Sequence, residues 1–452
     1  MFSFNLKKIK CQKYFEKIDK LSQSLVKIKT IYQPIKFKQF LLKKIMSAKK
    51  YIYITTLYLE NDDAGKKILH ALYAAKKKRP NLDIKIVLDW HRAQRNRIGS
   101  LKKDNNADWY YKISLIYPFI DIPIFGIPVS KIEVFGVLHL KGFLFDNVVI
   151  YSGASINNSY LNQHKYYRYD RYHVIQNNSL SISMKNFIDK ILIFSPYHQR
   201  LNKKNRTNLS KMKKLIKKFR NNLKYANYQF KSDTKKSELK ITPIIGFGKK
   251  NKLNYLITNL MYTTKKKIII CTPYFNFPKS LIFIINHLLS CNKYVEIIIG
   301  DKTANDFYTS PKEPFSFISI LPYLYEINLR KFIYKLQKFI ENKHLIVRIW
   351  KHGNNSYHLK GIWIDNYWQL ITGSNLNLRG WKLDLENALL IYDPNQKLKK
   401  QKNQELFHIR KHTFIIKSYK ELENVKSYPK KVRKTIVNLQ RIHFDKIIHR
   451  FI

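Results

Sequence analysis

Apolar residues in the first half of the chain alternate between helical and strand spacing. Helical spacing repeats every three to four positions, whereas a buried strand gives a short continuous apolar run. The spacing predicts, in chain order, a helix over Phe37 to Ala48, a buried strand over 51–59, a helix over Lys66 to Lys78, and strands over Leu82 to Trp90 and Ile132 to Val137. The segment FLFDNVVIYSG that follows is typical of a strand pair turning at Asp146-Asn147.

The second half repeats this order of elements. The spacing predicts a helix over Leu253 to Tyr262, a buried strand over 266–275, a helix over 280–290, a strand over Val295 to Asp301, a helix near Leu329 to Glu341, and a strand over His344 to Trp350. Strands that alternate with helices indicate an α/β fold class. We therefore expect two repeats, each a mainly parallel sheet flanked by helices.

This repetition predicts an N-terminal half over residues 1–200, a basic linker over 201–240 and a C-terminal half over 241–452. Within the linker, apolar residues from Leu209 to Leu223 recur at helical spacing, and lysines fill most other positions. A basic amphipathic helix of this kind can lie on an anionic membrane surface. It can equally pack on the protein and leave a solvated basic face.

Composition limits the class of protein. The chain has 452 residues, 45% of them hydrophobic, which is enough for two ordinary cores. Three cysteines without metal-like spacing indicate a reducing compartment. The absence of a signal-like start and of an apolar run long enough to span a bilayer favours a cytoplasmic location.

The net charge of +55 has two interpretations. A basic surface attracts nucleic acid or anionic lipid. Because lysine is spread along the whole length, compositional drift accounts for the excess equally well. Charge alone therefore does not decide the function.

One short pattern occurs once in each half. HLKGFLFD contains His139 and Lys141, and HLKGIWID contains His358 and Lys360. On a strand, residues two apart share a face, so each His and Lys can meet one phosphate. One imidazole can attack phosphorus, the other can exchange protons, and the lysines can neutralise developing charge. The duplication predicts two half-sites that form one centre for phosphodiester chemistry at the interface of the repeats.

Further polar residues follow both copies at similar distances. Asn157 and Asn377 can donate to phosphate oxygens, and the carboxylates of Asp170 and Glu386 can orient the motif histidines. Asp146 and Asp365, the acidic residues of the motifs, lie at expected turns, where a structural or orienting role is favoured over direct chemistry. Turn or surface roles remain the alternative for the asparagines and the two later carboxylates. No Cys/His metal spacing or Gly-rich phosphate loop is present, so no metal or cofactor is expected.

This set of residues resembles the phospholipase D superfamily, whose duplicated motif is followed by Gly-Ser and Asn. The second half matches through Gly373, Ser374 and Asn377. The first half departs, because Ala154 stands where the family has Ser, and Ser155 is the candidate substitute. The resemblance implies a phospholipase D-like fold with one shared active site.

Within that superfamily the chain resembles the Gram-negative-type phosphatidylserine synthases over essentially its whole length. The resemblance rests on the motifs and on the segments Asp89 to Gly99 and Asp301 to Phe315. It implies phosphatidyl transfer from CDP-diacylglycerol to L-serine, with release of CMP, through a phosphatidyl-histidine. His139 is then the nucleophile and His358 the acid and base. No metal or organic cofactor is implied.

The implied substrates fit other features of the chain. Arg92, Arg95 and Arg97 can meet a diphosphate or a carboxylate, with plain surface charge as the alternative. Apolar residues in Trp109 to Val129 and Phe315 to Tyr325 can form a lipid-facing rim or pack as ordinary loops. An enzyme acting on a lipid must dock on the bilayer, so peripheral attachment to the inner face of the cell membrane is expected.

Three other readings remain. The same motifs would serve cardiolipin synthesis, phospholipid hydrolysis or nuclease action, and only substrate pockets distinguish them. A sequence pI of 10.0 also fits a nucleic-acid-binding protein, or contact with the ribosome, although no recognised binding module is present. An inactive scaffold is the third reading, but both motif copies keep every defining residue.

Overall fold

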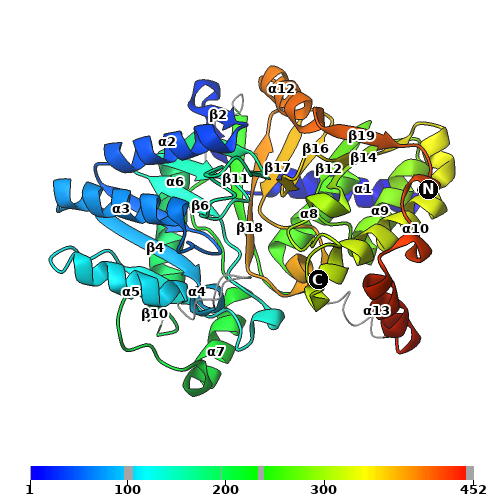
Figure 1. Ribbon diagram of the computed structural model, residues 1–452. Coiled ribbons are helices and arrows are strands. Elements are labelled where there is room, and N and C mark those ends of the chain that lie inside the picture. Colours follow the sequence, from blue (N-terminus) through cyan, green and yellow to red (C-terminus); the bar gives the residue numbers. More distant parts are fainter. Residues whose placement is uncertain (1, 96–104, 195, 233–238, 444–452) are drawn as a thin grey trace.

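Two β-sheets lie between outer layers of helices in the computed structural model, which describes residues 2–95, 105–194, 196–232 and 239–443 (Figure 1). Helices of the first half cover one side and helices of the second half cover the other. One sheet has eight strands and the other has nine. The two halves therefore meet through their sheets, at the centre of the molecule.

The first sheet is built mainly from the N-terminal half. Its strand order is β10 (Gln199–Arg200), β5 (Ile124–Ile127), β4 (Asp83–Asp89), β3 (Tyr51–Thr55), β6 (Gly142–Phe145), β7 (Val148–Tyr151), β9 (Tyr172–Gln176) and β2 (Ile28–Ile31). The helices of this half are α2 (Pro34–Ser47), α3 (Asp63–Lys78), α4 (Trp90–Gln94), α5 (Asn106–Ile116) and α6 (Asn178–Phe187).

The second sheet repeats this plan. Its strand order is β1 (Leu21–Gln23), β11 (Leu239–Gly246), β18 (Glu386–Tyr392), β17 (Trp368–Thr372), β16 (Gly361–Ile364), β12 (Lys267–Cys271), β13 (Tyr294–Gly300), β14 (Leu345–Trp350) and β19 (Thr413–Ile416). The helices around it are α1 (Phe2–Lys17), α8 (Lys252–Tyr262), α9 (Lys279–Ser290), α10 (Leu321–Glu341), α11 (Leu378–Lys382), α12 (Lys399–Arg410) and α13 (Lys430–Arg441).

The two α/β repeats are confirmed, but the sheets are mixed rather than mainly parallel. Among the described strands of these two sheets, parallel pairing is limited to β3–β4–β5 in one half and β12–β13–β14 in the other. The hairpins that follow the motifs, β6–β7 and β16–β17, pair antiparallel and place β6 against β3 and β16 against β12. A hairpin connection makes its strands antiparallel, whereas a helical crossover keeps them parallel.

The third predicted strand of the first half was misplaced. The strand is β5, and 133–135 form a 3₁₀ turn. All four residues of β5 are buried, whereas Ile132 and Val134 are exposed. The apolar run at 132–137 therefore reflects an exposed apolar loop, which local spacing does not distinguish from a strand.

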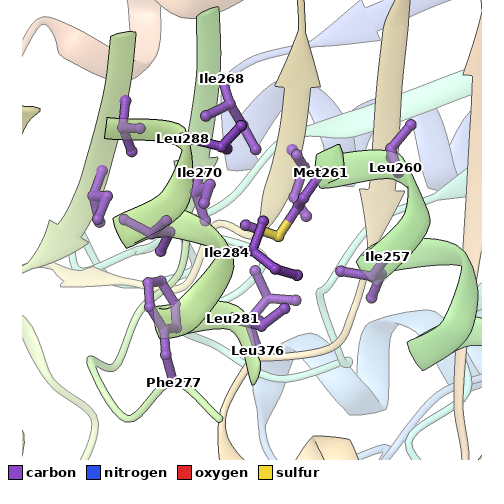
Figure 2. Packing of buried hydrophobic residues seen from close by; sticks show 14 of the residues in the cluster. Ile257, Leu260, Met261, Ile268, Ile270, Phe277, Leu281, Ile284, Leu288 and Leu376 are labelled. Carbon is purple, nitrogen blue, oxygen red and sulfur yellow. The ribbon is translucent and has the colours of Figure 1, made fainter. Parts of the chain in front are cut away.

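Separate outer cores hold helices on each sheet. In the second half, Ile257 and Met261 of α8 and Ile284 of α9 pack over Ile268 and Ile270 of β12 (Figure 2). A third, central core joins the halves. It includes Val149 and Ile175 of the first sheet with Ile241, Leu389 and Ile391 of the second. Because these side chains bury apolar area between the sheets, they fix how the motif segments face each other.

Two segments cross the simple division of the chain. Near the N-terminus, Cys11 and Phe15 pack in the core of the second half, and β1 pairs with β11. In the linker, α7 (Lys213–Leu223) buries Ile216, Phe219 and Leu223. The linker helix is therefore packed on the protein, with its lysines exposed.

Candidate active site

The two motif aspartates hold turns rather than the reactive centre. Asp146 accepts hydrogen bonds from the backbone N–H groups of residues 49, 50 and 51 at 2.9, 2.7 and 3.0 Å. Asp365 accepts the equivalent set from residues 265, 266 and 267 at 2.5, 2.8 and 2.7 Å. Both lie at the opposite end of the strand from the motif His. Each carboxylate thus ties a motif hairpin to the start of its neighbouring strand.

Each motif histidine lies in an extended segment just before its strand, paired with the other half. The N–H of His139 donates to the carbonyl of Leu385 at 2.9 Å, and that of His358 donates to the carbonyl of Tyr169 at 2.9 Å. Leu385 and Tyr169 each precede a predicted carboxylate by one residue. This backbone pairing brings each histidine to the carboxylate of the opposite half.

The side chains follow the same crossed pattern. Nδ1 of His139 lies 2.9 Å from both carboxylate oxygens of Glu386. Nδ1 of His358 lies 3.8 Å from Oδ2 of Asp170. All four side chains are buried. Because Glu386 holds Nδ1–H, His139 presents the lone pair of Nε2 to its surroundings.

The two half-sites are not equivalent. The hydroxyl of Tyr160 lies 2.9 Å from Nδ1 of His358, and Nζ of Lys360 lies 2.8 Å from Nε2. The His358 ring thus has polar neighbours that can exchange protons with it. His139 instead has a tight carboxylate partner, which favours different roles for the two imidazoles.

Both lysines reach toward glycines of the other half. A Cβ atom on Gly153 would lie 2.6 Å from Oδ2 of Asp170 and 3.3 Å from Nζ of Lys360. A Cβ atom on Gly373 would lie 2.9 Å from Cγ of Lys141. These two positions require glycine because the Asp and Lys side chains approach the backbone closely.

The residue after each carboxylate holds the opposite lysine by its backbone. Asn387 accepts from the N–H of Lys141 at 3.0 Å and donates to its carbonyl at 2.9 Å. Nη1 of Arg171 donates to the carbonyl of Lys360 at 2.7 Å. Arg171 is itself buried, in an ion pair with Glu405. Sequence reasoning missed both residues, although their position next to the two carboxylates was a usable signal.

Burial and mutual repulsion favour neutral forms at the centre. Burial, then the charges of Lys141 and Lys360, lowers the pKa of His139 well below its usual value. Burial and the charge of Lys360 lower the pKa of His358 in the same way. Burial also lowers the pKa of Lys141 to about 8 and that of Lys360 to about 7.

The pKa values of the carboxylates shift in the opposite direction. Burial raises the pKa of Asp170 to about 6, and burial followed by the charge of Asp384 raises the pKa of Glu386 well above its usual range. Burial disfavours the charged form of every group here. An anionic substrate entering between the lysines would favour their charged forms.

A cavity of about 680 Å³ opens onto His139 and His358. Four arginines line it together with acidic partners. Arg92 and Arg95 pair with Glu133 at 2.9 and 3.1 Å, Arg168 pairs with Asp306 at 2.8 Å, and Arg379 pairs with Asp384 at 3.0 Å. Arg97 lies outside the described residues. Arg168 and Arg379 lacked any motif signal, although Arg379 follows Asn377 by only two positions.

The Asn and Ser residues of the family pattern divide between the cavity and its support. Asn157 and Asn377 line the cavity and use their carbonyl oxygens to accept from Tyr160 N and Gly380 N, at 3.0 and 2.9 Å. Nδ2 of Asn377 makes no hydrogen bond within the described residues and is available to phosphate. Ser374 is buried against the Gly380 turn instead.

The departure at Ala154 is local. Its N–H donates to Ser152 Oγ, as the N–H of Ser374 donates to Thr372 Oγ1, so Ala154 occupies the place equivalent to Ser374. Ser155 lines the cavity at the position equivalent to Asn375, which also lines it. Ser155 therefore does not occupy the place of the family Ser.

The described residues hold no candidate metal site and no candidate membrane span. No group of three or more His, Cys, Asp or Glu side chains there is arranged to hold a metal ion. Among the helices of residues 2–443 that the structure describes, none has the length and apolar character of a membrane span.

Comparison with known proteins agrees with the duplicated motif and with the geometry of the site. A family model described as "Cardiolipin synthase, PLD-like domain" matches residues 257–409. The chain is 48% identical, over 99% of both chains, to the CDP-diacylglycerol–serine O-phosphatidyltransferase PssA of Escherichia coli (strain K12). It is 48% identical to the Haemophilus influenzae enzyme of the same name over 91% of this chain and 92% of the relative.

A solved structure agrees with this sequence similarity. The crystal structure of phosphatidylserine synthase from Haemophilus influenzae Rd KW20 matches with a TM-score of 0.95 and 43% identity, covering 99% of this chain and 100% of that one. The shared fold, the duplicated motif and the identity over the whole length point the same way. The chain belongs to the CDP-diacylglycerol–serine O-phosphatidyltransferase family of phospholipase D-like enzymes.

Proposed function

We propose that this chain transfers the phosphatidyl group of CDP-diacylglycerol to L-serine, forming phosphatidylserine and CMP through a covalent phosphatidyl-histidine. One observation carries the proposal: both motif histidines line a single cavity, and each lies beside a carboxylate from the other half. This is the arrangement that a two-step displacement at phosphorus requires. Membership of the transferase family supports the choice of substrates.

In the first step, Nε2 of His139 attacks the phosphatidyl phosphorus. The bond from phosphorus to the oxygen bridging to CMP breaks, and CMP leaves with a proton from His358, whose charged form the bound anionic substrate favours. Glu386 stabilises the positive charge that develops on the His139 ring, since it holds Nδ1–H. Lys141 and Lys360 neutralise the non-bridging oxygens in the transition state.

In the second step, the serine hydroxyl attacks the same phosphorus. His358, now neutral, takes the hydroxyl proton, and the bond from phosphorus to His139 breaks to release phosphatidylserine. His358 thus acts first as the acid and then as the base. One imidazole can serve in both steps because the leaving group and the acceptor lie on the same side of the phosphorus. Tyr160, at 2.9 Å from His358, orients the ring.

The cavity mouth fits a membrane surface. Val134 and Ile318 line the cavity and are 41% and 37% exposed, and Ile132 and Phe317 beside them are also exposed. Apolar side chains ringed by basic groups are typical of peripheral attachment. The N-terminal part of this rim is the loop at 131–136. In the segment expected to provide it, Trp109 is buried in the core, whereas Leu115, Ile116 and Phe119 are exposed but are not among the cavity-lining residues.

Two basic helices support the rim segments. Arg220 of α7 donates to the carbonyls of Val129 and Phe135 at 2.8 and 3.4 Å. Val432 and Ile436 of α13 share a core with Ile320, at the end of the 317–320 turn. The lysines of α7 and α13 are exposed, and both helices lie along the lower edge of the view in Figure 1. We infer that this side faces the anionic inner leaflet.

The reaction is tested with purified protein, CDP-diacylglycerol in mixed micelles and labelled L-serine, beside His139→Ala and His358→Ala. Serine-dependent CMP release with labelled phosphatidylserine, lost in both variants, is expected. Mapping of a phosphate group to residue 139, after quenching without serine at alkaline pH where the P–N bond of a phosphohistidine survives, tests the intermediate. CMP release with phosphatidic acid or another lipid as product would contradict the choice of acceptor, and no turnover by the wild type would contradict the enzyme itself.

A further inference from the structure

The charged groups of the cavity leave one carboxylate without a cation. Glu133, Asp306 and Asp384 each pair with an arginine, and Glu386 meets His139. Glu60 also lines the cavity, but within the described residues it forms no ion pair. An anion in a site otherwise built for phosphate needs a reason, because it repels the donor substrate.

Glu60 is held in place beside His358. Its Oε2 accepts from Nδ2 of Asn157 at 3.1 Å, and the carbonyl of Asn157's side chain accepts from Tyr160 N at 3.0 Å. The Tyr160 hydroxyl then lies 2.9 Å from His358. A short chain of contacts thus links the unpaired carboxylate to the imidazole proposed to activate the acceptor.

A cation lies on the same wall. The guanidinium carbon of Arg168 is 4.7 Å from the centre of the Tyr160 ring, and Nη1 donates to the hydroxyl of Tyr58 at 3.1 Å. Tyr58 and Glu60 are two residues apart in one segment that lines the cavity. A guanidinium has five N–H donors, which is more than the contacts of Arg168 with Tyr58, Asp306 and Ser356 use.

The arginines divide between the two histidines. After burial and Lys360, the charge of Arg168 lowers the pKa of His358. After burial and the two lysines, Arg379 and Arg92 act on His139 instead. Arg168 therefore belongs to the half of the cavity from which the acceptor attacks, opposite the covalent bond at His139.

We propose that Glu60 and Arg168 form the acceptor subsite for a zwitterionic amino acid, with Glu60 binding the α-ammonium group and Arg168 the α-carboxylate. The subsite deepens the proposed function and rests on its assignment of His358 as the acid and base. Held at both ends, the amino acid directs its hydroxyl toward His358. Glycerol has neither charge, and water has no group to fill the subsite, so both leave Glu60 unpaired.

The test compares acceptors in the wild type and in Glu60→Gln. Loss of one charge-assisted hydrogen bond is expected to raise KM for L-serine about 10- to 100-fold. The preference for L-serine over 3-hydroxypropanoate, which lacks only the ammonium group, should shrink by a similar factor. Glu60→Asp should recover part of this preference for L-serine. Asp63→Asn, an exposed carboxylate nearby that is not among the cavity-lining residues, is the matched control and should leave KM for L-serine unchanged.

A second measurement needs no variant. L-alanine, which keeps both charges and lacks the hydroxyl, should compete with L-serine in the wild type, whereas propanoate and ethylamine should compete at least tenfold less well. An active wild type with an unchanged serine KM in Glu60→Gln, or with equal inhibition by the three compounds, would overturn the subsite alone. A wild type that forms no phosphatidylserine would overturn the proposed function and the subsite together.

Discussion

At the scale of single residues, the crossed carboxylates make the two half-sites unequal. Glu386 contacts Nδ1 of His139 with both oxygens, whereas Asp170 stands 3.8 Å from His358, which has Tyr160 and Lys360 as closer neighbours. A carboxylate in direct contact fixes the tautomer of its histidine and stabilises the imidazolium. The half with the tight pair should depend more strongly on its carboxylate.

We therefore expect Glu386→Gln to lower kcat for phosphatidylserine formation about 100-fold or more. Asp170→Asn should lower it by about tenfold, because Tyr160 and Lys360 still orient His358. Steady-state kinetics of both variants, with circular dichroism to confirm folding, measures the difference. An effect of Asp170→Asn as large as that of Glu386→Gln would contradict the asymmetry.

The lowered lysine pKa values predict an unusual pH dependence. Lys360 and Lys141, with pKa values of about 7 and about 8, lose positive charge as the pH rises, and with it their stabilisation of the transition state. Burial and the two lysine charges hold the pKa of His139 well below its usual value, so the nucleophile is already neutral at these pH values. The ratio kcat/KM for CDP-diacylglycerol should fall about tenfold or more between pH 8 and 9.5.

This ratio reports the free enzyme and the first half-reaction, so the amino group of serine does not affect it. The measurement needs constant ionic strength and micelle composition. A control with Lys250→Gln, an exposed lysine of the Gly248 turn outside the cavity lining, should show the same profile as the wild type. A flat profile up to pH 10 would show that both lysines stay charged in the free enzyme.

Most residues of the centre could be predicted, because chemistry limits which side chains act on a phosphodiester. His139, Lys141, His358 and Lys360 follow from the motif, and Asp170 and Glu386 from their spacing. The crossing of the pairs could not be predicted, since it depends on the pairing of Leu138 with Leu385 in a backbone bridge between the halves. Arg168 and Glu60 were missed because neither belongs to a repeated pattern.

At the scale of elements, the motif hairpins show what an apolar pattern does and does not specify. The strand pair turning at 146–147 was predicted, because Asp-Asn between two apolar runs is typical of a turn. The three backbone contacts made by each motif Asp were not, since they join segments about one hundred residues apart in sequence. The same long-range pairing makes the sheets mixed.

These contacts predict a stability effect that is separate from catalysis. Asp146→Ala and Asp365→Ala each remove the acceptor for three N–H groups and should lower the free energy of unfolding by about 1–3 kcal/mol. The folded variants should keep kcat within about twofold, since neither carboxylate lines the cavity. Urea titrations followed by circular dichroism measure the stability. Glu313→Ala, in an exposed loop, should change it by less than about 0.5 kcal/mol.

At the scale of the whole molecule, the duplicated motif was enough to predict a shared centre, but composition did not show where the charge acts. The net charge of +55 is spread over the sequence, and much of it decorates outer helices such as α3. The helices α7 and α13 pack against the apolar rim of the cavity, and this packing brings their basic side chains to one side of the molecule. We therefore expect position in the fold, rather than total charge, to select the side proposed to face the membrane.

That distinction can be measured with vesicles containing phosphatidylglycerol. Replacing Lys430, Lys431, Arg433 and Lys434 of α13 with Gln should lower the partition coefficient about tenfold or more at 0.1 M NaCl, because each basic residue near an anionic surface contributes about 1 kcal/mol. Replacing four exposed lysines of α3 (Lys66, Lys67, Lys77 and Lys78) removes the same charge from the outer side of the first half and should have a much smaller effect. At 1 M NaCl, where the screening length falls to about 3 Å, the two variants and the wild type should converge on the weak binding left by the apolar rim. Equal losses for α13 and α3 at low salt would show that the charge acts as a whole and that no side of the molecule is selected.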